Sequence, residues 1–337
     1  MRKRILVLSI ILGLCYSCSQ SNAEAHRNEN RGAALGTSYN IISITANEID
    51  FQKDIDSVFM AINHSLSTYI PESDISRINK GDSTVVVDKM FEDVFALSKS
   101  IHAATEGYFD PTVGTLVNAW GFGPEQQITL DSLKVDSLLN YVGLDKVSIN
   151  SEKQVIKTNR NIYLDFNAIA KGYAIDRIAV MLNKKGVKNY LIEVGGELVA
   201  KGRNIISDKS WVVGIDDPQM QTDRTTKILI HLNDRALASS GNYRKFRIDE
   251  STGKKYVHTI NPKTGFTQLS NTLAVTILAD DCATADAYAT AFMAMDLHEA
   301  FKLINENKNL EAYIIYLDEN GDTQEYLTKG FKDLVVN

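Results

Sequence analysis

Polar and apolar residues alternate in several short segments of the chain, and other segments repeat apolar residues every three to four positions. Alternation with β-branched residues predicts strands, whereas the longer period predicts amphipathic helices. The predicted strands span 37–45, 84–88, 161–166, 189–194, 211–216, 226–232 and 272–279. The predicted helices span 49–68, 90–105, 131–140, 168–185, 283–294 and 297–306. Because strands and helices interleave along the whole chain, we expect a mixed α/β (α+β) architecture in one unit.

The first 17 residues have the order of a signal peptide, with basic residues at 2–4 followed by an apolar run at 5–14. A run of about ten apolar residues is too short to cross a bilayer as a helix. Ser17 directly before Cys18 is similar to a bacterial lipoprotein cleavage site, at which Cys18 becomes the lipid-modified first residue. We therefore expect a lipid anchor on Cys18, with plain secretion as the alternative.

Residues 18–32 contain almost nothing that could be buried, which predicts a flexible tether and a folded domain at 33–337. That length is sufficient for one large domain or for two intimately joined lobes. Cys282 would be the only thiol of a chain cleaved before Cys18, so no internal disulfide is expected. The net charge of −6, without basic clusters, argues against a nucleic-acid partner, because neutralising phosphates requires Lys and Arg.

The predicted helix at 283–294 is almost wholly apolar or small, yet Asp286 and Thr290 stand in it four residues apart. Residues at this spacing project from the same face of a helix. Because a buried carboxylate needs a positive partner, one interpretation pairs Asp286 with a Lys or Arg. The other interpretation gives both oxygens to a hard cation such as Mg²⁺. The spacing alone favours the first.

Three other segments carry polar groups where small molecules often bind. Asp165 ends a predicted strand, and Lys171 lies in the first turn of the following helix, where anions are favoured. Gly195 and Gly196 follow another strand and permit positive φ or a close approach of a ligand. His258 stands beside an Asn-Pro turn, although a lone histidine is more often a packing or surface residue. Each of these signals is weak by itself.

Taken in order, eight motifs of the chain resemble the ApbE family, the FAD:protein FMN transferases or flavin transferases. The motifs are "LGTSY" at 35–39, "STYIPESDISRIN" at 67–79, "GYFDPTVGTLVNAWGFG" at 107–123, "DFNAIAKGYAIDR" at 165–177, "YLIEVGGELVAKG" at 190–202, "ASSGNYR" at 238–244, "HTINPKTG" at 258–265 and "ATADAYATAF" at 283–292. The resemblance implies a T-fold-related architecture. It also implies cleavage of FAD with Mg²⁺ and transfer of FMN, through a phosphoester, to a threonine hydroxyl of an acceptor protein, with release of AMP.

The same resemblance implies roles for single residues. Asp286 and Thr290 correspond to metal ligands, and the backbone carbonyl of Ala168 corresponds to a third. His258 is the candidate group for assisting proton transfer from the acceptor, and Lys171 is the second candidate catalytic group. The residues expected to hold the dinucleotide are Leu35, Tyr69, Tyr108, Phe109, Asp110, Asp165, Lys171, Gly195, Gly196, Glu197, Ser240 and His258.

Three positions depart from the family pattern, and none of them removes a metal-binding or catalytic side chain. Leu35 stands where Met is frequent, Tyr108 where a small residue is frequent, and Asn167 where Gly or Ser is usual. The departures concern the packing around the flavin rings more than the reaction.

The resemblance also implies a partner, because the chain lacks the acceptor motif of the family, which is similar to D-G-x-T. We therefore expect modification of another protein, such as a subunit of a sodium-pumping NADH:quinone reductase or an Rnf-type complex. The implied location is the periplasmic face of the inner membrane, with the protein lipid-anchored. A Mg²⁺-dependent FAD pyrophosphatase that yields FMN and AMP, or a non-catalytic FAD-binding lipoprotein, are the alternatives.

Overall fold

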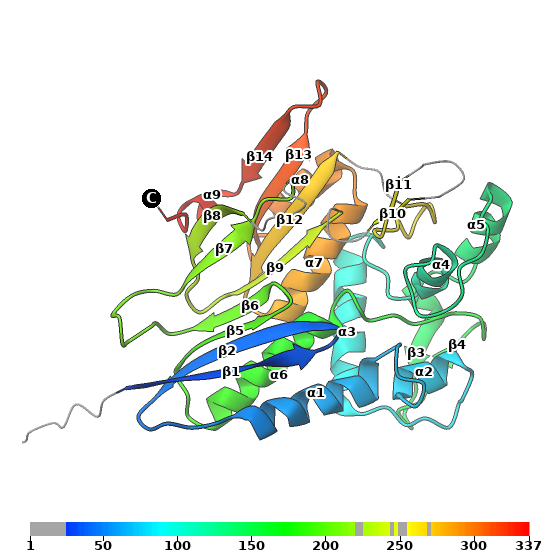
Figure 1. Ribbon diagram of the computed structural model, residues 1–337. Helices are drawn as coiled ribbons and strands as arrows, with labels where there is room; N and C mark the ends of the chain where they lie inside the picture. The colour runs from blue at the N-terminus through cyan, green and yellow to red at the C-terminus, as the bar shows by residue number, and fades with distance from the viewer. Residues whose placement is uncertain (1–24, 220–224, 243–245, 249–254, 268–270, 337) are drawn as a thin grey trace, which may run out of the picture.

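The computed structural model describes residues 25–219, 225–242, 246–248, 255–267 and 271–336 (Figure 1). The predicted signal peptide at 1–17 and the predicted lipidation site Cys18 lie outside these residues. Within the described part of the chain, no helix combines the length and apolar character needed to cross a bilayer.

An antiparallel sheet of eight strands forms the centre of the molecule, in the order β1-β2-β5-β6-β9-β12-β13-β14. Its strands are β1 (His26–Ala34), β2 (Thr37–Thr45), β5 (Asn189–Val194), β6 (Glu197–Lys201), β9 (Ala236–Gly241), β12 (Thr272–Ala279), β13 (Glu311–Leu317) and β14 (Thr323–Leu327). The predicted mixed α/β class is confirmed, and the strands predicted at 37–45, 189–194 and 272–279 have the bounds expected.

Four helices cover one face of this sheet and form the main core with it (Figure 1). They are α1 (Gln52–Leu66), α3 (Lys89–Ala104), α6 (Ala170–Lys184) and α7 (Cys282–Ala294). Helix α7 packs against β9 and β12 on one side and against α6 and α3 on the other. Because α7 is enclosed on both sides, its small and apolar residues are nearly all buried, as the sequence of this helix requires.

The opposite face of the sheet is covered by the hairpin of β7 (Val212–Asp216) and β8 (Thr226–His231), together with α9 (Lys329–Lys332). A smaller apolar cluster surrounds Leu116 and Trp120, beside the main core, which fits two closely joined lobes. The remaining elements are α2 (Asp74–Asn79), α4 (Gly114–Ala119), α5 (Ser132–Leu139), the 3-10 helix Leu144–Lys146, β3 (Val147–Ile149), β4 (Val155–Lys157), β10 (Phe246–Ile248), β11 (Lys255–Val257) and α8 (Leu297–Glu306).

Two predicted strands are wrong, because neither segment forms a strand; 161–166 makes only an isolated bridge, between Tyr163 and Val113. In 161–166 the backbone of Leu164 bonds to the side-chain amide of Asn79, with Nδ2 donating to the carbonyl and Oδ1 accepting from the N–H, each at 2.8 Å. In 84–88 the single ladder-like bond runs from the N–H of Val87 to the carbonyl of Lys153. The segment 161–166 is therefore a mostly buried connection, whereas 84–88 is a connection that buries only Val85 and Val87 and leaves Val86 exposed.

The predicted tether at 18–32 is also wrong from His26 onward, because these residues begin β1. The strand pairs with β2 along its whole length, from His26 opposite Thr45 to Ala34 opposite Thr37. Asn28 is buried with its side chain donating to Thr45, so the polar composition of β1 conceals a paired strand. The folded domain therefore begins before residue 33.

Candidate active site

Helices α6 and α7 touch backbone to backbone at Gly172. A Cβ atom at this position would lie 2.3 Å from the carbonyl oxygen of Cys282 and 2.8 Å from the Cα of Ala283. Only glycine leaves room for this approach. The contact brings the first turn of α6, which carries Lys171, against the start of α7, one turn before Asp286.

Asp286 faces α6 across this contact, and its side chain is buried. The N–H of Gly172 donates to its Oδ2 at 3.1 Å. Burial raises the pKa of Asp286, against the opposing effects of the Lys171 ammonium and the Gly172 N–H. A carboxylate in this position gains from a nearby cation, because the amide of Gly172 and Lys171 offset its desolvation only in part.

The start of α6 leaves one carbonyl without a backbone partner. In an ordinary helix the N–H of Gly172 would donate to the carbonyl of Ala168, four residues earlier. Here that N–H donates to Asp286, and within the described residues no hydrogen bond to the Ala168 carbonyl is recorded. The result is an available carbonyl oxygen on the segment that Asp286 faces.

Thr290 lies one turn after Asp286 on α7 and is partly buried. Its Oγ1 lies 3.5 Å from the Oγ of Ser240, which is at the end of β9. The predicted pair on one helix face is thus placed beside the predicted Ser240 turn. The described residues contain no cluster of three or more His, Cys, Asp or Glu side chains, so a metal here would rely on neutral oxygens besides one carboxylate.

Lys171 extends from α6 to the sheet, where its Nζ lies 2.6 Å from Oε2 of Glu197. Glu197 is only 2% exposed and begins β6, directly after the turn at Gly195 and Gly196. Both glycines have positive φ, and a Cβ on Gly195 would lie 2.7 Å from the side chain of Thr37. The turn therefore has room only for glycine at its first position, and it fixes Glu197 beside Lys171.

A second tight turn lies at the same end of the sheet. Leu35 and Gly36 join β1 to β2, both with positive φ, which is strained for leucine. The N–H of Gly195 donates to the carbonyl of Ser38 at 3.0 Å, which ties the two hairpins together. Leu35 is partly buried against the main core. The structure thus brings Leu35 together with the glycine turn, as their shared assignment requires.

Asp165 and Tyr69 are two of the residues expected to hold the dinucleotide. Asp165 is buried, and its Oδ1 accepts from the N–H of Asn167 at 2.7 Å. Tyr69 is 58% exposed. Partial burial of its phenol, and then the Asp165 carboxylate, raise the pKa of Tyr69. Asn167 donates to the hydroxyl of Thr68 at 3.4 Å, which places the segment that carries Tyr69 beside the one that carries Asp165.

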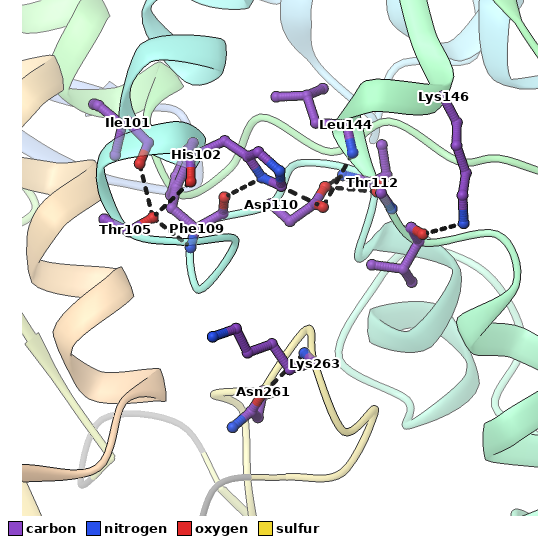
Figure 2. Close-up of polar contacts among 12 residues, drawn as sticks. Ile101, His102, Thr105, Phe109, Asp110, Thr112, Leu144, Lys146, Asn261 and Lys263 are labelled. Atoms are coloured by element: carbon purple, nitrogen blue, oxygen red, sulfur yellow. Dashed lines mark hydrogen bonds and ion pairs between the residues drawn. The ribbon is translucent and has the colours of Figure 1, made fainter. Parts of the chain in front are cut away.

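The segment 108–110 divides between the interior and the surface. Phe109 is 3% exposed within the main core. Figure 2 shows the Asp110 carboxylate between His102 and the Thr112–Leu144 region, where it accepts from the N–H and Oγ1 of Thr112 and from the N–H of Leu144. Burial raises the pKa of Asp110, against these hydrogen bonds. The side chains of Phe109 and Asp110 therefore shape the loop, and their predicted contacts with the dinucleotide stay predictions.

Tyr108 connects this loop to the segment that follows His258. Its ring lies under the Nζ of Lys263 at 4.0 Å, and its hydroxyl donates to Glu299 at 2.7 Å. Such a cation over an aromatic face is attracted to the ring by about 1 kcal/mol. Tyr108 therefore holds the loop at 258–265 from one side.

The loop at 258–265 is also held from its other sides. The side chain of Asn261 accepts from the N–H of Lys263 and donates to the carbonyl of Ala294 at the end of α7 (Figure 2 shows the Asn261–Lys263 bond). Trp120 donates to the carbonyl of Gly265 at 2.8 Å. His258 is partly buried at the start of this loop. The loop thus carries His258 on a frame anchored to α7.

The sequence did not single out two further residues that lie at this site. Asp176 lies on α6 and accepts from the N–H groups of Cys282 and Ala283 at the start of α7. Glu299 bonds Tyr108 from a distant helix. The signal for Asp176 was a carboxylate among apolar residues of an amphipathic helix, whereas nothing in the sequence distinguishes Glu299 from other surface acids.

The fold is shared with flavin transferases. The flavin transferase ApbE of Vibrio cholerae is similar with a TM-score of 0.82 and 31% identity, over 92% of this chain and 99% of that chain. The apo flavinyl transferase ApbE of Pseudomonas stutzeri is similar with a TM-score of 0.81 and 26% identity, over 92% and 97% of the two chains.

The relatives by sequence agree with this class. The FAD:protein FMN transferase of Haemophilus influenzae is 32% identical over 334 residues, covering 95% of each chain. That of Escherichia coli K12 is 30% identical over 296 residues, covering 86% of this chain and 82% of its own. The profile of the ApbE family matches residues 35–314, and the chain belongs to the ApbE family.

Proposed function

We propose that this protein transfers FMN from FAD to a threonine hydroxyl of an acceptor protein, with Mg²⁺ held by Asp286, Thr290 and the Ala168 carbonyl. FAD:protein FMN transfer is the activity named for its relatives in Haemophilus influenzae and Escherichia coli. The observation that carries the metal assignment is the Gly172 N–H, which bonds to Asp286 in place of Ala168. This exchange supplies a buried carboxylate and an available carbonyl at the same helix start.

The donor set fits a hard divalent cation, which prefers carboxylate, carbonyl and hydroxyl oxygens over nitrogen or sulfur. When bound there, Mg²⁺ would supply positive charge to offset the charge that develops on the pyrophosphate oxygens. Lys171 adds a second positive charge, and Glu197 holds its ammonium group in place at 2.6 Å. These groups orient the pyrophosphate and stabilise its charge.

The transfer forms one bond between the threonine oxygen and the FMN phosphorus and breaks the bond from that phosphorus to the AMP oxygen. The hydroxyl proton has to leave, and we assign its acceptance to the imidazole of His258. The loop that carries His258 is anchored by Asn261, which donates to the Ala294 carbonyl at the end of α7, and by Trp120, which donates to the Gly265 carbonyl. Tyr69 and Tyr108 offer aromatic faces at the approach to the site, to which we assign flavin or adenine contacts.

The proposal includes a location and a partner class. The signal-peptide pattern and the Ser17–Cys18 junction support a protein that is lipid-anchored at the periplasmic face of the inner membrane. The acceptor would be a protein with a D-G-x-T-like segment, as on a subunit of a sodium-pumping NADH:quinone reductase or an Rnf-type complex. Labelling Cys18 with a radioactive fatty acid, with Cys18→Ser as the control, tests the anchor.

The activity is tested with a purified chain that starts after Cys18, FAD, Mg²⁺ and an acceptor domain that carries the threonine motif. We expect a fluorescent flavin on the acceptor and one AMP released for each flavin attached. Asp286→Ala is expected to abolish both, because it removes the only carboxylate of the proposed metal set. Asp280→Ala is the matched control, since Asp280 is 88% exposed and lies just before α7.

Three outcomes would contradict parts of the proposal. Retained transfer in Asp286→Ala would overturn the metal assignment. Rapid, repeated AMP release from FAD without an acceptor would indicate a pyrophosphatase. Tight FAD binding without AMP release from any acceptor mixture would indicate a flavin carrier.

A further inference from the structure

Asp176 makes a contact between α6 and α7 that the reaction itself does not use. Its Oδ1 accepts from the N–H of Cys282 at 2.8 Å, and its Oδ2 accepts from the N–H of Ala283 at 2.9 Å. One carboxylate of α6 therefore holds the first two N–H groups of α7. These groups have no partner within their own helix.

The start of α7 also has an ordinary cap from its own segment. The side chain of Asp281 accepts from the N–H of Thr284 at 2.8 Å, and its backbone carbonyl accepts from the N–H of Ala285. Asp281 thus satisfies the third and fourth N–H groups, and Asp176 satisfies the first and second. Since one cap is local and the other comes from α6, the two can be separated by mutation.

We infer that Asp176 is a positioning residue, which sets the register of α7 along α6 and so fixes Asp286 and Thr290 relative to the Ala168 carbonyl. Asp176 lies one turn after Gly172 on α6, and Asp286 lies one turn after Cys282 on α7. The two helices are therefore joined by polar contacts at two places about one turn apart. Asp176 accepts from Cys282, and Gly172 donates to Asp286.

Two contacts a turn apart fix both the sliding and the rotation of α7 against α6. The close approach at Gly172 sets the distance between the helices, since the carbonyl oxygen of Cys282 lies against its Cα. The Asp176 carboxylate then sets the position of Cys282 along α6. Without it, the bond from Gly172 to Asp286 is the main polar restraint on the register. Outer groups of this kind commonly change metal affinity by about 10–100-fold.

The inference rests on the proposed function, because it assumes a metal between Ala168, Asp286 and Thr290. The test therefore measures metal binding directly, by the electron paramagnetic resonance signal of free Mn²⁺ during titration of the purified chain without nucleotide. The variants are Asp176→Ala and Asp176→Asn, and Asp281→Ala is the matched control. Melting temperature and the Mg²⁺ concentration for half-maximal AMP release are measured on the same preparations.

We expect Asp176→Ala to weaken Mn²⁺ binding by about tenfold or more and to raise the Mg²⁺ requirement by a similar factor. Asp176→Asn is expected to fall between Asp176→Ala and the unchanged protein, because one amide oxygen can still accept a bond. Asp281→Ala loses a cap on the same helix and is expected to lower the melting temperature without changing Mn²⁺ affinity. If Asp176→Ala does not fold, Asp176→Asn carries the comparison.

Unchanged Mn²⁺ affinity in a folded Asp176 variant would overturn the inference. An equal loss in Asp281→Ala would overturn it as well, because any cap of α7 would then have the same effect. Mn²⁺ binding that depends on Asp176, in a protein that transfers no flavin to any acceptor, would overturn the proposed function and leave the positioning role standing. If the wild-type protein binds no Mn²⁺, both the positioning role of Asp176 and the proposed function with its metal site are overturned.

Discussion

Replacing Gly172 with Ala tests whether the contact between α6 and α7 determines activity. The added Cβ would lie 2.3 Å from the carbonyl oxygen of Cys282, 2.6 Å from its carbonyl carbon and 2.8 Å from the Cα of Ala283. All three are backbone atoms, so no side-chain rotation relieves the overlap. Because carbon atoms pack best at about 3.5–4.0 Å, the two helices have to separate by roughly 1 Å at this point.

The expected loss of stability is modest, and the expected loss of activity is large. Overpacking of this size costs about 1–3 kcal/mol, whereas Ala gains about 1 kcal/mol over Gly in helix propensity. The free energy of unfolding should therefore fall by roughly 0–2 kcal/mol. The same movement pulls the Gly172 N–H away from Asp286, and a displacement of about 1 Å in a site can cost about a hundredfold in rate.

Urea unfolding and the rate of AMP release at a series of Mg²⁺ concentrations measure the two effects separately. Gly214→Ala is the control, since its Cβ would meet only side-chain atoms of Thr226 and Leu229, far along the chain from α6 and α7. If Gly172→Ala released AMP at the wild-type rate and needed no more Mg²⁺ than the wild-type protein, the reasoning would be refuted. An equal loss of rate in Gly214→Ala would refute it as well.

Two further predictions concern charged groups. Burial raises the pKa of Asp176 to about 7, above its unfolded value of about 3.9, although the two N–H bonds lower it. The folded state therefore binds more protons between these pH values, and stability falls as pH rises through them. Asp176→Asn removes this contribution. As pH rises through this range, the free energy of unfolding of the variant, measured with urea, should therefore increase relative to that of the wild-type protein by up to about 1.4 kcal/mol per pH unit. A difference that does not change with pH would contradict the raised pKa. Lys171→Met leaves Glu197 buried without its ammonium partner and should cost about 3–5 kcal/mol. The double variant Lys171→Met/Glu197→Gln should recover most of that stability but not flavin transfer, and a fully stable single variant would contradict the pairing.

Periodic hydrophobic patterns were sufficient to predict the helices that build the site. The helix predicted at 283–294 is α7, which begins one residue earlier, and the helix predicted at 297–306 is α8 with the same bounds. These segments are predictable because each buries a wide apolar face, so local pattern and tertiary packing agree. The placement of Asp286 and Thr290 on one face of α7 follows from the same period.

The wrong predictions for 161–166 and for β1 have physical causes that a short segment of sequence does not contain. The segment 161–166 has the composition of a strand, but the backbone of Leu164 bonds to the side chain of Asn79, about 85 residues away, and the N–H of Asp165 bonds to the carbonyl of Pro111. Strand β1 is polar enough to predict disorder, and only its pairing with β2 and the burial of Asn28 make it part of the sheet. Strand propensity and hydrophobicity show that a segment could pair with another strand, but a sheet forms only where a neighbouring strand is present to pair with it.

In the site, too, the sequence indicates single residues, but contacts between residues far apart in the chain could be seen only in the fold. Family resemblance gave Lys171 a place near FAD, yet its ion pair with Glu197 joins residues that are 26 positions apart and could only be seen in the fold. The register that Asp176 imposes on α7 joins residues more than 100 positions apart. Motifs identify which groups matter, and packing decides which of them meet.

The course of β1 fixes how the enzyme would face its surroundings. His26 lies at the end of the sheet where Ile44 pairs with Asn189, and the strand then runs nine residues, roughly 30 Å, to the Leu35–Gly36 turn beside Gly195. The chain therefore enters the domain at the end of the sheet opposite the turns at Leu35–Gly36 and Gly195–Gly196. An enzyme held by Cys18 would present its reactive end away from the lipid. With the proposed anchor and site, acceptor segments that protrude into the aqueous space would then be easier to reach than threonines lying at the bilayer surface.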